Sequence, residues 1–215
     1  MAPTTRRRPG RPAQPVSRDY LIAQATLAFS EGGFAGTSMA MLAERTGLRK
    51  ASLFHHFASK DALYDEVITV ALGDLASLLP TLDAKTPWVS SLDLLGERVI
   101  DHLSAHPHVA RLLMREILGG GLMARRGDLV LAVVRAVSAF LEAGMQRGAI
   151  PRADPSQMAM ALIGLHLTWY AAPDLSEAIS STDITSDEAR VFRRAQVLPM
   201  IRAMCGVRSP SDANG

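Results

Sequence analysis

Residues 39–57 decide the fold, and their sequence is MAMLAERTGLRKASLFHHF. Ala43 is small where two helices must approach closely, and Gly47 can adopt the positive φ that a tight turn requires. The large apolar side chains available for inward contacts are Leu42, Leu48, Leu53 and Phe57. This spacing predicts helices over 39–45 and 49–56 joined by a short turn, which is the anatomy of a helix-turn-helix.

The outward side of the 49–56 helix carries hydrogen-bond donors at Arg49, Lys50, Ser52, His55 and His56. Donors of these kinds recognise phosphate groups and base edges in DNA. The same stretch also fits an ordinary helical hairpin with a solvated face. Residues 39–57 alone therefore leave two interpretations open.

The net charge of +2 is distributed unevenly along the chain. Residues 1–60 contain nine lysines and arginines but three acidic residues, which gives +6 and leaves −4 for the remainder. A basic end on an otherwise acidic chain is typical of a protein whose end meets a polyanion. A solubilising tail would produce the same distribution, so the charge does not by itself identify DNA as the partner.

Residues 1–16 are rich in proline and arginine and almost lack large apolar side chains. Such a segment cannot bury enough apolar surface to order itself, which predicts a flexible basic arm. Arginines in arms of this kind enter the narrow minor groove of DNA, where the negative potential is enhanced. The candidates for this contact are Arg6, Arg7, Arg8 and Arg11.

Helical patterns continue on both sides of the central stretch. Ser17 is a good N-cap for a first helix that ends at Gly32-Gly33, and Ser59 caps a fourth helix that runs to about residue 79. Alanine and leucine are abundant, which favours helices over strands. Further helices are predicted to about residue 105, then over 107–118, 128–147, 155–172 and 187–205, with a polar loop at 173–184.

These patterns predict an all-α chain with two domains. A three-helix module with the helix-turn-helix occupies 17–62, and a larger helical domain occupies 63–205. Residues 206–215 are predicted to be a disordered tail.

The segment from Leu21 to Leu63 resembles the N-terminal domain of the TetR family of bacterial transcriptional regulators (TetR/AcrR type). The matching residues are, in order, Phe29, Gly33-Phe34, Gly36-Thr37-Ser38-Met39, Leu42-Ala43, Gly47-Leu48, Leu53-Phe54-His55-His56-Phe57 and Ser59-Lys60-Asp61-Ala62-Leu63. Individual pairs are common in proteins, but the ordered set across the whole segment is highly specific. The resemblance therefore implies a DNA-binding helix-turn-helix and not a plain hairpin.

The resemblance also implies particular DNA contacts. Thr37 and Ser38 would hold phosphate groups, and Lys60 would do so at the start of the fourth helix with help from the helix dipole. The residues that would lie in or beside the major groove are Arg49, Lys50, Ser52, His55 and His56. Phe54 and His55 stand where family members often carry two tyrosines. Because Phe54 lacks the hydroxyl, its expected partner is a thymine methyl group.

For the remainder of the chain, the resemblance implies a domain that senses a small molecule and dimerises. Helices over 155–172 and 187–205 would form a four-helix interface with the same helices of a second copy. Residues 158–172 contain no charged residue, which fits a helix that is buried on two sides. A mostly apolar pocket in this domain would suit a small hydrophobic or aromatic effector.

Aromatic, polar and flexible side chains of this domain are candidates for the pocket. They are Trp88, His102, Met114, Arg115, Met123, Phe140, His166, Trp169 and Tyr170. For each of them, ordinary packing in the core or on the surface is the alternative explanation.

No catalytic residue, cofactor or metal is expected. The sequence contains no Walker A, Gly-x-Ser-x-Gly, His-Glu-x-x-His or dinucleotide-binding motif. His102, His106 and His108 are better explained as solvated residues at a helix end than as metal ligands, because Pro107 interrupts the helix. The single cysteine, Cys205, rules out an intramolecular disulfide framework and is expected to be a buried thiol.

We expect a repressor that binds a palindromic operator as a homodimer and leaves it when an effector favours the non-binding conformation. The fourth helix, 61–79, joins the two domains and would transmit the change. No signal peptide or membrane span is recognisable, so a cytoplasmic, bacterial protein is expected, associated with the nucleoid when bound to DNA. A non-specific architectural DNA binder is the competing interpretation, and it predicts affinity that hardly depends on DNA sequence.

Overall fold

The computed structural model describes residues 16–207, which contain ten α-helices and no β-strand. The predicted arm, with Arg6, Arg7, Arg8 and Arg11, and nearly all of the predicted tail lie outside the described residues. The helices are α1 (Arg18–Gly36), α2 (Met39–Arg45), α3 (Lys50–His56), α4 (Lys60–Ser77), α5 (Trp88–Ala105), α6 (Pro107–Leu118), α7 (Gly121–Gln146), α8 (Pro155–Ala171), α9 (Pro173–Ser180) and α10 (Asp187–Met204). The predicted all-α fold class is confirmed.

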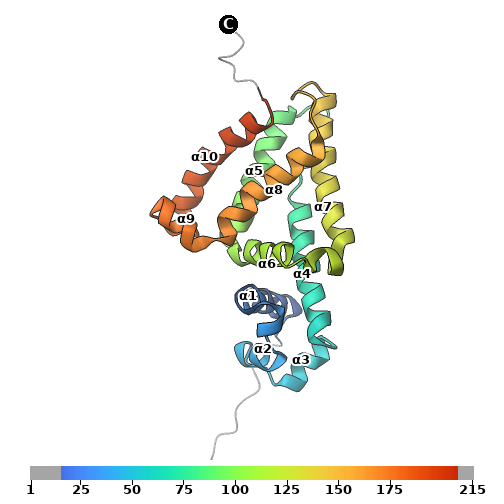
Figure 1. Ribbon diagram of the computed structural model, residues 1–215, viewed down its shortest axis with the longest axis vertical. Helices are drawn as coiled ribbons and strands as arrows, with labels where there is room; N and C mark the ends of the chain where they lie inside the picture. Colours follow the sequence, from blue (N-terminus) through green and yellow to red (C-terminus); the bar gives the residue numbers. More distant parts are fainter. Residues whose placement is uncertain (1–15, 208–215) are drawn as a thin grey trace, which may run out of the picture.

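The helices form two groups that follow one another along the long axis of the molecule (Figure 1). Helices α1, α2 and α3 lie at one end, α5 to α10 form a larger bundle, and α4 runs from the first group into the second. Helix α1 packs against α4 and α6, and α4 packs against α7. The domain boundary predicted at residue 62 falls in the first turn of α4, so one continuous helix links the two parts.

Serine side chains close the N-termini of four helices, of which α1, α2 and α4 build the N-terminal part. Ser17, Ser38 and Ser59 each accept a hydrogen bond from the backbone N–H three residues later, at 3.1, 3.2 and 3.0 Å. These bonds satisfy amides that have no partner inside the helix. The predicted caps at Ser17 and Ser59 are confirmed, and Gly47 in the turn between α2 and α3 has the expected positive φ, 69°.

Helix α1 does not end at Gly32-Gly33, as the sequence had predicted. The helix kinks at Gly33, which has φ 69°, and then continues to Gly36. Arg115 of α6 packs against the kink, because a Cβ at Gly33 would lie 2.6 Å from Nη1 of Arg115. The kink therefore sits at a contact between distant helices, which a local sequence pattern does not reveal.

Two other predicted boundaries are wrong. The segment 173–184 was expected to be a loop, but it contains α9, and Ser176 of that helix donates a hydrogen bond to the carbonyl of Trp169 (2.7 Å). Helix α7 begins at Gly121 instead of residue 128 and kinks at Arg126. The arginines of its first turns form ion pairs with α4, which stabilises a start that the glycine-rich sequence does not favour.

The larger bundle has its own core around Trp88. The indole Nε1 donates a hydrogen bond to the carbonyl of Phe140 (3.0 Å), and the two ring centroids are 5.1 Å apart. Gly144 allows this approach, because a Cβ there would lie 2.5 Å from the indole. Within residues 16–207, no helix is long and apolar enough to cross a membrane.

Candidate nucleic-acid interface and ligand cavity

One face of α3 is buried and the opposite face is polar. Leu53 is 1% exposed and anchors the helix in the core of the N-terminal group. Arg49, Lys50 and His55 are exposed, whereas Ser52 and His56 are half-buried. Residues 46–60 contain no acidic side chain. The result is a positively charged surface at the end of the molecule remote from the larger bundle (Figure 1).

Phe54 gives this polar surface one apolar group. Its side chain is 41% exposed, and Nζ of Lys50 lies 5.9 Å from the centre of its ring. A phenyl ring with a neighbouring ammonium group suits an apolar base group beside a phosphate, which is compatible with the contact expected from the sequence.

The two residues expected to hold phosphate before α2 have different environments. Ser38 is exposed, and its hydroxyl oxygen caps α2, so its hydroxyl hydrogen is left to donate outward. Thr37 is only 2% exposed, and its hydroxyl donates to the carbonyl of Ala28 (3.1 Å). The Thr37 side chain therefore braces the junction of α1 and α2 from inside, and of this pair only Ser38 presents a side chain to solvent.

Lys60 also points inward. Its ammonium group donates hydrogen bonds to the carbonyls of Phe34 (2.8 Å) and Thr37 (3.1 Å), and it lies 4.1 Å from the centre of the Phe34 ring. These contacts tie the start of α4 to the segment that leads into α2. Two of the three N–H groups are thus used inside the protein, although the family resemblance implied a phosphate contact for Lys60.

Arg18 is a site residue that sequence reasoning missed. Its guanidinium donates to the carbonyl of His56 at the end of α3 (2.7 Å) and to Glu66 of α4 (2.7 Å from Nε), and it lies 4.4 Å from the centre of the Phe57 ring. Arg18 therefore fixes the C-terminal end of α3 against α1 and α4. Its partners lie 38 and 48 residues away, so no local signal could have identified it.

Arginines of the larger bundle reach the N-terminal group at two places. On α6, Arg115 donates to the carbonyl of Glu31 (3.2 Å) beside the kink of α1. On α7, Arg125 lies 3.4 Å from a carboxylate oxygen of Asp61 on α4 and covers the Phe34 ring at 4.6 Å. These contacts link the two helix groups independently of the covalent connection through α4.

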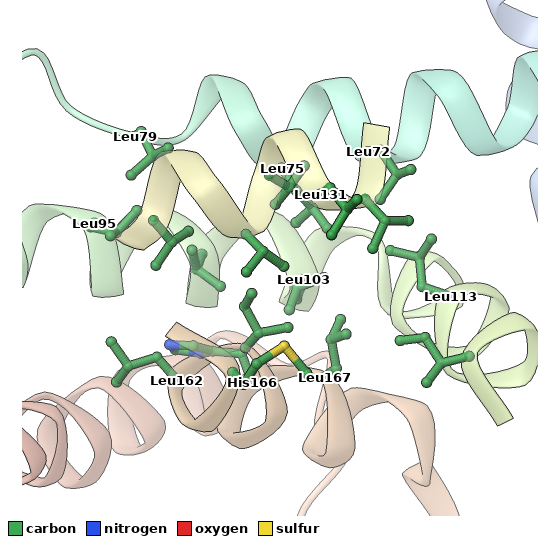
Figure 2. A pocket seen from close by; sticks show the side chains of 18 of the residues that line it. Leu72, Leu75, Leu79, Leu95, Leu103, Leu113, Leu131, Leu162, His166 and Leu167 are labelled. Carbon is green, nitrogen blue, oxygen red and sulfur yellow. The ribbon is translucent and has the colours of Figure 1, made fainter. Parts of the chain in front are cut away.

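A cavity of about 380 Å³ lies inside the larger bundle. Figure 2 shows Leu72, Leu75 and Leu79 of α4 on one side and Leu162, His166 and Leu167 of α8 on the other. Residues of α5, α6, α7 and α10 complete the wall. The cavity has a size typical of small-molecule sites, which occupy about 300–1,000 Å³.

His166 is the polar side chain in this wall. It is 6% exposed, and its Nδ1 has no hydrogen-bond partner. Burial lowers the pKa of His166 to about 3, and the charge of Arg193 acts in the same direction. The imidazole is therefore neutral at physiological pH.

Of the residues suggested for a pocket by the sequence, His166 and Met123 line this cavity. Trp88 and Phe140 are packed together in the core, and Arg115 faces α1. Trp169 lies under the guanidinium of Arg193, 4.4 Å from ring centre to Cζ. The remaining suggested residues, which also do not line the cavity, are His102, Met114 and Tyr170. The hydroxyl of Tyr170 is hydrogen-bonded to the hydroxyl of Ser104 on α5 (2.8 Å).

Two of the three histidines near Pro107 differ from their predicted environment. His106 is exposed, as predicted, whereas His102 and His108 are half-buried, and burial lowers the pKa of both. The rings of His102 and His106 are 5.1 Å apart. Cys205 is buried, as expected, and burial raises the pKa of its thiol to about 11.

Helices α8, α9 and α10 expose large apolar side chains. The most exposed are Met160, Leu175, Ile179, Val191, Phe192, Met200 and Met204. Scattered apolar residues are normal on a surface, and others are exposed elsewhere on this chain, but seven on three consecutive helices mark a candidate protein interface.

Family models match both parts of the chain. Residues 21–67 match the model described as bacterial regulatory proteins, tetR family. Residues 89–201 match the model described as tetracyclin repressor-like, C-terminal domain. Together the two matched segments take in the α3 face and most of the helices around the cavity.

Individual relatives agree with these matches. The chain is 30% identical over 102 residues to the HTH-type transcriptional repressor KstR2 of Mycolicibacterium smegmatis, covering 45% of this chain and 50% of that protein. It is 32% identical over 86 residues to the negative regulator IcaR of the biofilm operon of Staphylococcus aureus, covering 40% and 45%. The matched segments thus span about half the length of these curated relatives.

Solved structures share the fold over a longer range. A bacterial regulatory protein in the tetR family from Rhodococcus RHA1 has a TM-score of 0.70 at 16% identity, covering 90% of this chain and 100% of that one. The ketosteroid regulator KstR2 of Mycobacterium tuberculosis has a TM-score of 0.66 at 18% identity, covering 88% and 95%. At these identities the likeness concerns the fold.

Proposed function

The chain belongs to the TetR family of bacterial regulatory proteins, and from this membership we propose that it is a sequence-specific DNA-binding repressor released from its operator by a small molecule. The observation that carries the proposal is the exposed face of α3. There Arg49, Lys50, Phe54 and His55 are exposed, and residues 46–60 contain no acidic side chain. A helix that presents such donors suits the major groove, and the hydroxyl of Ser38 suits the adjacent phosphate.

The proposed DNA-binding form is a homodimer. Residues 155–172 and 187–205 supply the interface, because α8 and α10 expose Met160, Val191 and Phe192 to solvent in a single copy. A twofold dimer places two α3 helices in successive major grooves, about one turn of DNA apart. The operator is therefore a palindrome of two half-sites.

The proposed release mechanism uses helices shared by the cavity and the interdomain contacts. Leu113 and Ile117 of α6 line the cavity, and Arg115 between them reaches the kink of α1. On α7, Met123 lines the cavity, and Arg125 two residues later pairs with Asp61. A ligand that pushes these helices apart shifts the population toward a conformation whose N-terminal group no longer fits DNA.

The test is binding of the purified protein to DNA flanking its own gene, against scrambled DNA of equal length, at two salt concentrations. We expect binding to one short palindrome to exceed binding to scrambled DNA by about 10³-fold or more. Equal and steeply salt-dependent binding to the flanking DNA, the scrambled DNA and a genomic library of fragments would contradict the proposal and favour a non-specific architectural binder.

The inward position of Lys60 leads to a separate prediction. We expect Lys60→Ala to lower the free energy of unfolding by about 2 kcal/mol, because two charge-assisted hydrogen bonds to Phe34 and Thr37 are lost. Affinity for every DNA should fall because the segment before α2 loosens. Urea denaturation and fluorescence anisotropy with labelled DNA measure the two effects.

Lys85→Ala is the matched control for this prediction. It removes the same charge from an exposed position outside the N-terminal group and should change neither quantity. The alternative is that Lys60 binds phosphate directly. In that case Lys60→Ala would leave the free energy of unfolding unchanged and would lower the salt dependence of DNA affinity by the amount expected for one phosphate contact.

A further inference from the structure

We infer that the cavity accepts an elongated, uncharged apolar ligand that carries one hydroxyl or carbonyl group, which hydrogen-bonds to His166. This inference deepens the proposed function, since it names the chemical class of the releasing molecule. It rests on the composition, the length and the single polar group of the cavity wall.

The wall is almost entirely hydrocarbon. It is formed by leucine, valine, isoleucine and methionine side chains with two glycines, and it contains no aspartate, glutamate, lysine or arginine. An ionised ligand group would lose its hydration there without gaining a partner of opposite charge, which is strongly unfavourable. The wall therefore selects against carboxylates and ammonium groups.

The nearest candidate cation does not alter this conclusion. Arg193 of α10 is 8% exposed, and its Nη2 donates to the carbonyl of Leu165 (3.1 Å). Its guanidinium also lies over Trp169 and, at 5.5 Å, over Tyr170. Arg193 is not part of the cavity wall, so a ligand carboxylate inside the cavity does not contact its guanidinium directly.

The cavity is long enough for an extended chain. Leu72, Leu75 and Leu79 line it along two turns of α4, which corresponds to about 10 Å of helix at about 1.5 Å per residue. Figure 2 shows these side chains following one another along the same side of the space. Four lining residues, Ile117, Met123, Leu131 and Met160, are exposed, so the cavity is open to the surface.

His166 supplies the specific contact. In a neutral imidazole, one nitrogen donates a hydrogen bond and the other accepts one, so the ring serves a ligand hydroxyl or carbonyl equally. Nδ1 has no hydrogen-bond partner among residues 16–207, and a buried polar atom without a partner is costly. A ligand oxygen that reaches Nδ1 removes that cost, whereas a pure hydrocarbon does not.

The test compares ligands of equal chain length with the purified full chain in the absence of DNA. The probes are decan-1-ol, decanoate and decylammonium at pH 8, with affinities measured by isothermal titration calorimetry. We expect decan-1-ol to bind at least about 10-fold more tightly than either ion and to raise the unfolding temperature. Equal or tighter binding of either ion, or no binding of decan-1-ol, would overturn the inference.

Variants locate the binding in this cavity. Val134→Trp fills it and should weaken decan-1-ol binding more than 10-fold, whereas Val70→Trp, on α4 outside the cavity wall, should leave it unchanged. His166→Phe should weaken binding about 3- to 10-fold, as expected for one lost hydrogen bond. Unchanged affinity in Val134→Trp would place the ligand elsewhere and overturn the inference.

Failure of this inference is distinguishable from failure of the proposed function. The ligand comparison uses protein without DNA, and the operator assay uses DNA without ligand. If the protein binds a palindrome but prefers decanoate, the repressor proposal stands and the inferred ligand class is wrong. If it binds decan-1-ol but no specific DNA, the inferred ligand class stands and the repressor proposal is wrong.

Discussion

The double substitution Arg49→Ala, Lys50→Ala is expected to weaken operator binding by about 100-fold or more at physiological salt. Both side chains are exposed at the start of α3, and neither forms an ion pair with an acidic residue among residues 16–207. Loss of a specific DNA contact costs about 1–3 kcal/mol, and a dimer loses each contact twice. Fluorescence anisotropy with the operator fragment measures the change.

The matched control for this pair is Lys85→Ala, Arg135→Ala. These residues are also exposed, and their replacement removes the same charge from the larger bundle. The control variant should bind the operator as tightly as the wild type does. Both double variants should unfold at the same urea concentration as the wild type, because neither removes a buried contact. If the α3 double binds the operator like wild type, α3 is not the recognition helix of this protein.

Phe192→Glu is expected to convert the dimer into monomers at micromolar concentration. Phe192 is 59% exposed in a single copy, and burial of such a side chain contributes about 1.5–3 kcal/mol. Twofold symmetry doubles the loss, so the dimer dissociation constant should rise about 10²- to 10⁴-fold. Analytical ultracentrifugation measures the oligomeric state, and operator affinity should fall with it because the half-sites are no longer linked.

Leu118→Glu is the control for the dimer prediction. Leu118 is 80% exposed at the end of α6, outside the surface formed by α8, α9 and α10. Its replacement introduces the same charge at an even more exposed position and should leave the proposed dimer intact. A Phe192→Glu protein that sediments as a dimer would show that α10 does not form the interface.

Local sequence predicted most helix starts of the N-terminal group. Ala43, Gly47 and Leu53 predict two short helices joined by a turn, the family resemblance identifies them as a helix-turn-helix, and the serines before α1 and α4 identify the starts of those helices. These features depend on contacts within a few residues, where helix geometry fixes which side chains share a face. The same rule explains why Arg49 and His55 were correctly expected on the outward side of α3.

Local spacing could not predict contacts between helices that lie far apart in the sequence. Thr37 and Lys60 have the polarity of phosphate ligands, yet the structure turns both toward backbone carbonyls of the α1–α2 junction. Periodicity marks a residue as polar and places it near a helix start. It does not say whether a carbonyl from another helix is already within reach.

The sequence by itself determined the helical class, the position of the helix-turn-helix and the family resemblance. Only the tertiary structure decided which side chains share the cavity, because its wall combines Leu72, Leu113, Val134 and His166 from four different helices. Aromatic residues such as Trp88 and Tyr170 looked suitable for a ligand but fill the spaces between helices instead. The physical reason is that local spacing decides which side chains share a helix face. A cavity instead depends on how several helices pack together and where their side chains leave space between them.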